Sequence, residues 1–68
     1  MKLKDLIKKS VDSHDLKTLC GVVEELRTKH RLDYRGMAHI FEKHAGLDAD
    51  RFEGLMQELD EYEAHNED

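Results

Sequence analysis

The chain has no proline and no tryptophan, and its 68 residues include only one cysteine and four glycines. The single cysteine, Cys20, cannot form a disulfide within the chain, and it lacks the paired spacing of a structural zinc site. β-Branched residues are few outside Val22 and Val23, so the propensity for strands is low throughout. We therefore expect an all-α fold and a reducing, cytoplasmic setting.

Long apolar runs are also missing, which excludes a membrane-spanning helix and the apolar stretch of a signal peptide. A chain of 68 residues has room for one small domain but not for a large cofactor cleft. We place this domain at residues 1–64 and expect residues 65–68 to form a frayed acidic tail. We do not expect an enzyme, and we expect no cofactor.

Apolar residues recur at helical spacing in four segments, which short polar stretches separate. In the second segment the predicted apolar stripe consists of Leu16, Leu19, Cys20, Val23 and Leu26. The pattern predicts a compact, partly orthogonal bundle of four short helices, at residues 2–11, 14–30, 34–45 and 49–64.

Residues typical of helix ends mark most of these boundaries. Asp12 or Ser13 is expected to cap the second helix, and Asp33 and Asp48 the third and fourth. Gly46 lies where a helix end favours a left-handed residue. A second glycine, at position 21 inside the second helix, indicates close approach of a neighbouring helix.

The charge is unevenly distributed along the chain. Residues 1–35 contain nine Lys or Arg and six Asp or Glu, whereas residues 36–68 contain two and ten, so the net charge of −5 divides into +3 and −8. Lys2 and Lys4 lie at the positive end of the first helix dipole, and carboxylates crowd the negative end of the fourth. Either the two ends lie side by side in the monomer and compensate each other, or a partner supplies the opposite charge.

The residues offer little support for catalysis or for metal binding. His39 and His44 are five residues apart and lie on different sides of a helix, and the pair Glu61 and His65 has no further ligand in view. Cys20 falls on the apolar side of its helix, where a buried and inert thiol is expected. No catalytic constellation is visible, and we predict neither catalytic nor metal-binding residues.

The composition therefore favours a protein–protein interaction module, such as an adaptor, regulator or inhibitor. The partner is expected to be another protein with a basic surface, contacted by an acidic face of the fourth helix. The residues assigned to this face are Glu53, Glu58, Asp60, Glu61, Tyr62 and Glu63.

Three alternatives stay open. A nucleic-acid regulator would use a basic face made of Lys4, Lys8, Lys9, Arg27 and Arg31. Nucleic acid is nevertheless not the expected partner, because the acids of the fourth helix repel phosphate. An inhibitor could instead use those acids to mimic DNA, and a structural component could form a homodimer or a larger assembly of identical chains.

Overall fold

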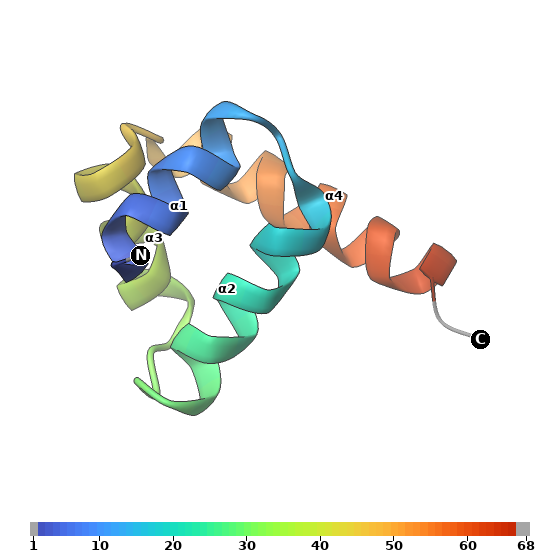
Figure 1. Cartoon of the computed structure of the whole chain (residues 1–68), viewed down its shortest axis with the longest axis horizontal. Helices are drawn as coiled ribbons and strands as arrows, with labels where there is room; N and C mark the ends of the chain where they lie inside the picture. The colour runs from blue at the N-terminus through green and yellow to red at the C-terminus, as the bar shows by residue number, and fades with distance from the viewer. Residues whose placement is uncertain (1, 67–68) are drawn as a thin grey trace.

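The computed structural model describes residues 2–66 and contains four helices in that range, α1 (Leu3–Asp12), α2 (Leu16–Thr28), α3 (Tyr34–Ala45) and α4 (Ala49–Asn66). The all-α bundle predicted from the sequence is confirmed (Figure 1). The bounds of α3 agree with the prediction, whereas α2 is shorter at both ends. Helix α4 continues through positions 65 and 66, where a frayed tail was predicted, and the last two residues of that tail lie outside the described range.

Aspartate side chains cap the N-termini of three helices, where they accept hydrogen bonds from backbone N–H groups of the first turn. Asp33 accepts from the N–H of Gly36 and Asp48 from that of Arg51, both at 2.8 Å, as predicted. The cap of α2 is Asp15, which accepts from Thr18, so the prediction of Asp12 or Ser13 was wrong. Helix α1 continues through Asp12, and Ser13 and His14 form the turn that ends it. The first residue that can cap α2 is therefore Asp15.

Two glycines have different roles from each other. Gly46 ends α3 with a φ of 71° and donates its N–H to carbonyls of the last turn, as predicted. At Gly21, in contrast, an added Cβ would meet no atom within 4 Å, and the residue is exposed. The predicted close approach of a neighbouring helix at Gly21 is therefore wrong.

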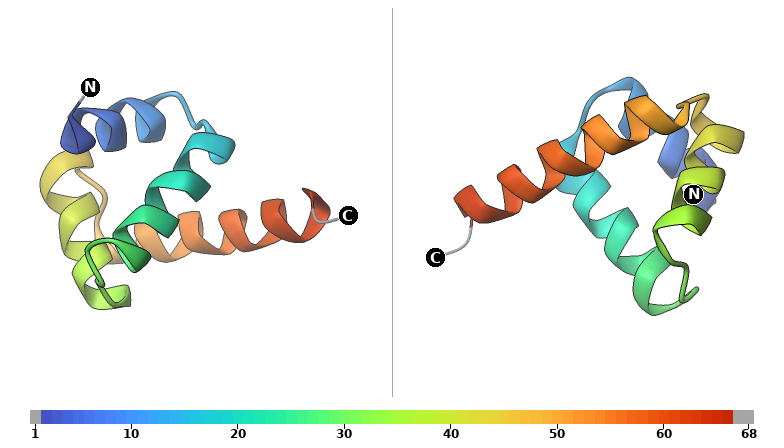
Figure 2. Two further views of the ribbon diagram at one scale, coloured as in Figure 1. Left: turned by 60° about the horizontal axis from the view of Figure 1, so that its bottom comes forward. Right: turned by 180° about the vertical axis from the view of Figure 1, so that it is seen from behind.

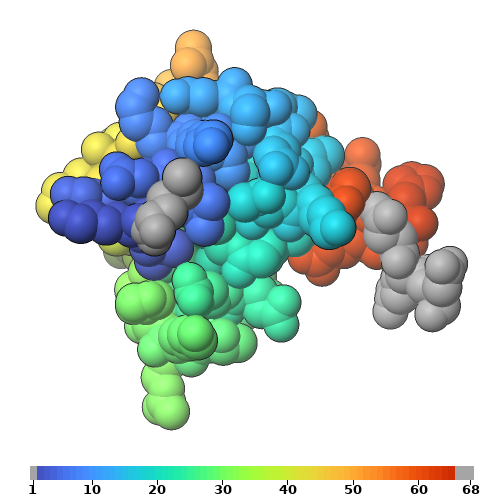
Figure 3. Space-filling model, viewed as in Figure 1, coloured from blue at the N-terminus to red at the C-terminus, as the bar shows by residue number. Residues whose placement is uncertain are grey.

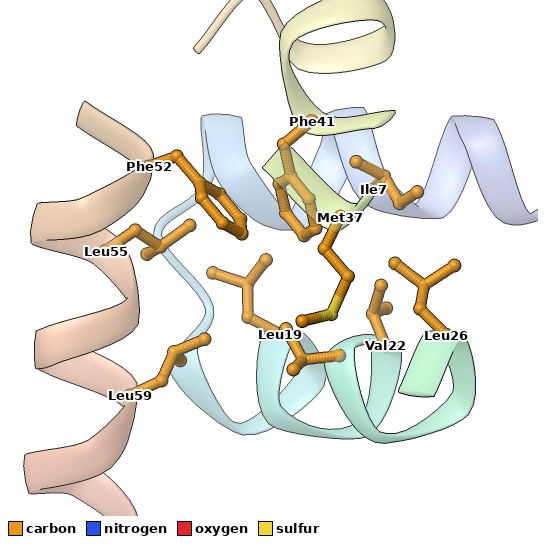
Figure 4. Packing of buried hydrophobic residues seen from close by; sticks show 10 residues of the cluster. Ile7, Leu19, Val22, Leu26, Met37, Phe41, Phe52, Leu55 and Leu59 are labelled. Carbon is orange, nitrogen blue, oxygen red and sulfur yellow. The ribbon is translucent and has the colours of Figure 1, made fainter. Parts of the chain in front are cut away.

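The core forms where one side of each helix meets the others (Figure 4). Phe41 and Phe52 lie at its centre with no exposed surface, and their ring centroids are 5.1 Å apart. Val22, which lies outside the predicted apolar stripe, is also buried, because α2 packs against both α1 and α4. The fully buried apolar residues are Ile7, Leu19, Val22, Val23, Leu26, Met37, Phe41, Phe52, Leu55 and Leu59.

The start of α1 and the end of α4 lie on opposite sides of the molecule (Figures 1 and 2). Helix α1 packs mainly on α2 and α3, and α4 packs on the same two helices. The start of α1 and the end of α4 are therefore not neighbours, and their charges do not compensate each other within the monomer. Of the two alternatives for the charge at these ends, the side-by-side arrangement within the monomer is therefore wrong, because it required a regular up-and-down bundle.

Candidate functional site

The C-terminal turns of α4 extend beyond the rest of the bundle (Figures 2 and 3). We call residues 60–66 the α4 arm. The helix is anchored by Phe52, Leu55 and Leu59, which bury one side of it in the core. None of residues 60–65 is fully buried, and Asp60 and Glu61 are exposed. The arm thus presents acidic side chains away from the core.

The six predicted contact residues do not form a single face. At 3.6 residues per turn, Glu61 points directly away from the core, and Glu53 and Asp60 lie together along one edge of this outer side. Glu58 lies on the opposite edge, where it contacts His14 at 2.8 Å. Tyr62 is partly buried and has an interaction of its own within the molecule.

Glu63 is the member of the set that faces α2 rather than the outside. Its carboxylate accepts a hydrogen bond from the Cys20 thiol. Burial raises the pKa of Cys20, and the hydrogen bond and negative charge of Glu63 raise it further. The thiol is only partly buried, whereas the sequence predicted a fully buried one. The pattern of apolar residues along α2 could not show this contact, because Glu63 comes from another helix.

Of the six predicted contact residues, three remain on the outer side of α4, namely Glu53, Asp60 and Glu61. These three side chains are exposed, and none of them forms an ion pair with another residue of the range 2–66. Asp60 and Glu61 are neighbours in the sequence and lie one turn from Glu63 and Glu58, respectively, so the carboxylates of this part of α4 repel one another. We refer to these three residues below as the acidic face.

The basic residues of the alternative hypothesis are divided among several places. Lys8 forms an ion pair with Asp12 at 3.4 Å. These two residues line a shallow hollow on α1, which Lys9 and Asp5 also line. Arg27 lines another hollow together with Glu63 and Glu24.

The other two members of the basic set lie elsewhere. Lys4 is at the start of α1, and Arg31 is in the α2–α3 connection with a φ of 53°. Carboxylates lie beside Lys8 and Lys9 and beside Arg27, so the surface near these three residues is mixed in charge rather than uniformly basic.

The sequence reasoning missed a groove of about 490 Å³ at the start of α1, which is bounded also by the end of α2 and by α3. Its lining combines aliphatic with basic side chains, namely Lys2, Leu3, Lys4, Leu26, His30, Leu32, Ile40 and His44. Their positions span more than forty residues of sequence, so no local motif could reveal the groove.

Within residues 2–66 no three His, Cys, Asp or Glu side chains are grouped so that they could hold a metal ion. Over the same range, none of the helices combines the length and apolar character needed to cross a bilayer. The chain matches no family model, no curated protein and no solved structure.

Proposed function

We propose that the protein is a small, non-enzymatic protein–protein interaction module that binds a basic surface of a partner protein through the acidic face of α4. The observation that supports this proposal is the exposure of Asp60 and Glu61 at the base of the projecting α4 arm, without an ion pair in residues 2–66. A partner cation placed there would compensate the mutual repulsion of the carboxylates.

Charged groups on an exposed helix act mainly on the rate and specificity of association. A single exposed ion pair contributes only about 0.2 to 1 kcal/mol, so affinity would need several pairs together with some apolar contact. Because the attraction is electrostatic, the complex should weaken as salt is raised.

The test uses the full chain, tagged, to recover partners from its source cells, with quantification by mass spectrometry. Glu61→Lys reverses one charge in the acidic face, and Glu42→Lys makes the same change at an exposed position of α3 as a matched control. We expect Glu61→Lys to reduce recovery of a specific partner several-fold and Glu42→Lys to leave it unchanged. Equal recovery with both variants would exclude the acidic face as the contact surface.

A stability measurement separates binding from a purely structural role. Reversing Asp60 and Glu61 to lysine should raise the melting temperature of the isolated protein at low salt, since the new lysines would lie one helical turn from Glu63 and Glu58. If the doubly reversed variant gained stability and still bound its partner normally, the carboxylates would have no role in recognition.

A further inference from the structure

The groove at the start of α1 has an aliphatic floor. Leu26 is buried there, and Leu3, Leu32 and Ile40 are partly buried, so each of the last three retains some surface in contact with solvent. These residues come from α1, α2, the α2–α3 connection and α3. The groove lies at the start of α1. The start of α1 is on the opposite side of the molecule from the α4 arm (Figures 1 and 2).

All the ionisable side chains that line this groove are basic. They are Lys2, Lys4, His30 and His44, and no carboxylate is among the lining residues. Lys2 and Lys4 form no ion pair within residues 2–66. In a chain with a net charge of −5, a groove lined only by bases and aliphatic groups is a distinct local environment.

The backbone adds to the positive potential at the same place. Lys2 is the N-cap residue of α1, and its side chain makes no capping hydrogen bond, so no side chain of the cap satisfies the first N–H groups of this helix. The positive end of the helix dipole therefore lies beside the two lysines. An anionic group bound there would receive N–H donors as well as ammonium charges.

We propose that this groove binds a monomeric anionic amphiphile, a medium-length alkyl carboxylate, with the carboxylate near Lys2 and Lys4 and the alkyl chain over the aliphatic floor. A purely apolar ligand would leave the lysines without a partner, and a small inorganic anion would leave the floor exposed. The groove volume of about 490 Å³ lies in the range of small-molecule sites. Charge complementarity and the aliphatic floor thus favour the same class of ligand.

Two other occupants fit the groove less well. An amphipathic helix needs a row of anchor pockets at helical spacing, whereas the floor here is formed by four aliphatic side chains in one compact area. An anionic bilayer would be repelled by the acidic half of the chain, which carries −8 over residues 36–68. The proposal is independent of the acidic face of α4, which lies at the other end of the molecule.

The experiment is an NMR titration of the full ¹⁵N-labelled chain with sodium decanoate below its micelle concentration. We expect saturable shifts at the amides of Leu3, Lys4, Ile40 and His44, around the groove. Decyltrimethylammonium, which has the same alkyl chain and the opposite charge, should bind at least about tenfold more weakly, as should butyrate, which lacks most of the chain. Equal binding of the cationic and anionic amphiphiles would overturn the proposal.

Charge reversal in the protein provides the matched comparison. The variant Lys2→Glu/Lys4→Glu should lose about tenfold in decanoate affinity, whereas Lys17→Glu/Lys43→Glu, with the same change in net charge at exposed positions outside the groove, should stay within about twofold of the unmodified chain. Circular dichroism would confirm that both variants are folded. An absence of saturable shifts, shifts centred on α4, or binding only to anionic vesicles or to acidic helical peptides would each refute the assignment.

Discussion

The imidazole Nε2 of His14 lies 2.8 Å from a carboxylate oxygen of Glu58, which joins the α1–α2 turn to the middle of α4 across 44 residues of sequence. His14 has a φ of 54°, a left-handed conformation that ends α1. The backbone N–H groups of His14 and Asp15 donate back to Val11 and Ser10 and close the turn. The residue that ends α1 thus also supplies a contact to α4.

Removing the carboxylate of this pair should have a small effect on stability. Both side chains are about half exposed, at 59% and 49%, so we expect Glu58→Gln to lower the free energy of unfolding by less than about 1 kcal/mol. Glu53→Gln, at an exposed α4 residue without an ion pair, is the control. Urea denaturation at low and high salt measures both. A loss that persisted unchanged in high salt would show that the contact is not electrostatic.

Replacing either of two glycines in helix interiors by alanine should stabilise the protein. Gly21 and Gly54 are exposed, and an added Cβ would meet no atom within 4 Å at either position. Alanine should therefore raise the free energy of unfolding by about 0.8 to 1 kcal/mol per site through helix propensity. Gly46→Ala is the contrasting variant, since a φ of 71° makes alanine unfavourable there. A loss of stability in Gly21→Ala would indicate a helix contact that the structure does not contain.

The packing of Phe41 against Phe52 makes the core sensitive to truncation. Phe41 has no exposed surface, and Phe→Ala changes in cores cost about 3 to 5 kcal/mol. Because small domains have little stability in reserve, we expect Phe41→Ala to be largely unfolded at room temperature. Tyr34→Ala, at a ring that also stacks near Phe52 but is 49% exposed, should remain folded. Thermal denaturation followed by circular dichroism distinguishes the two variants.

Local signals explain which parts of this fold were predictable. The starts of α3 and α4 follow from Asp33 and Asp48, because an N-cap acts within one helical turn. The burial of Val22 was missed because it depends on α4 covering a second side of α2, which a single apolar stripe does not encode. The start of α2 was also misplaced, since a left-handed His14 in the α1–α2 turn has no strong sequence signal.

The candidate sites show the same difference between features that the local sequence determines and features that depend on packing between helices. The excess of carboxylates on α4 was visible in the sequence, but the division of these carboxylates was not. Glu58 and Glu63 contact His14 and Cys20 from other elements, and only the tertiary arrangement separates them from Asp60 and Glu61. The basic groove depends on the meeting of three helices and was invisible for the same reason.

The Asp15 cap should make stability depend on pH in the acidic range. Hydrogen bonds from the Thr18 hydroxyl and backbone N–H lower the pKa of Asp15 below its usual value. A carboxyl whose pKa is lower in the folded state contributes stability above its unfolded pKa, and that contribution disappears as the pH falls through the folded pKa.

Comparison with a neutral side chain isolates this contribution. Asp15→Asn retains the capping ability but does not titrate, so its melting temperature should fall less on acidification than that of the unmodified chain. Scanning calorimetry from neutral pH to below pH ~3 tests this expectation. Identical acid dependence in the two proteins would contradict it.

The contact between Cys20 and Glu63 should control the reactivity of the only thiol. Burial and the neighbouring carboxylate raise the pKa of Cys20, so the reactive thiolate is scarce near neutral pH. Glu63→Gln removes the negative charge, and we expect it to lower the pKa of Cys20 and to speed alkylation by iodoacetamide at a pH of about 8. The rate should rise along a titration curve displaced to lower pH, which separates a change in pKa from a change in access.

The same pair determines a stability effect of the opposite sign to that of Asp15. Because the pKa of Cys20 is raised in the folded state, its protonated form contributes stability at low pH. That contribution is lost as the pH rises from the unfolded pKa through the folded pKa, so the protein should become less stable in alkali. Glu63→Gln should flatten this decline, whereas Glu61→Gln, on the outer side of the same helix, should not. If both variants alkylated at the rate of the unmodified chain over the full pH range, the hydrogen bond from the thiol to Glu63 would have no effect on Cys20 in solution.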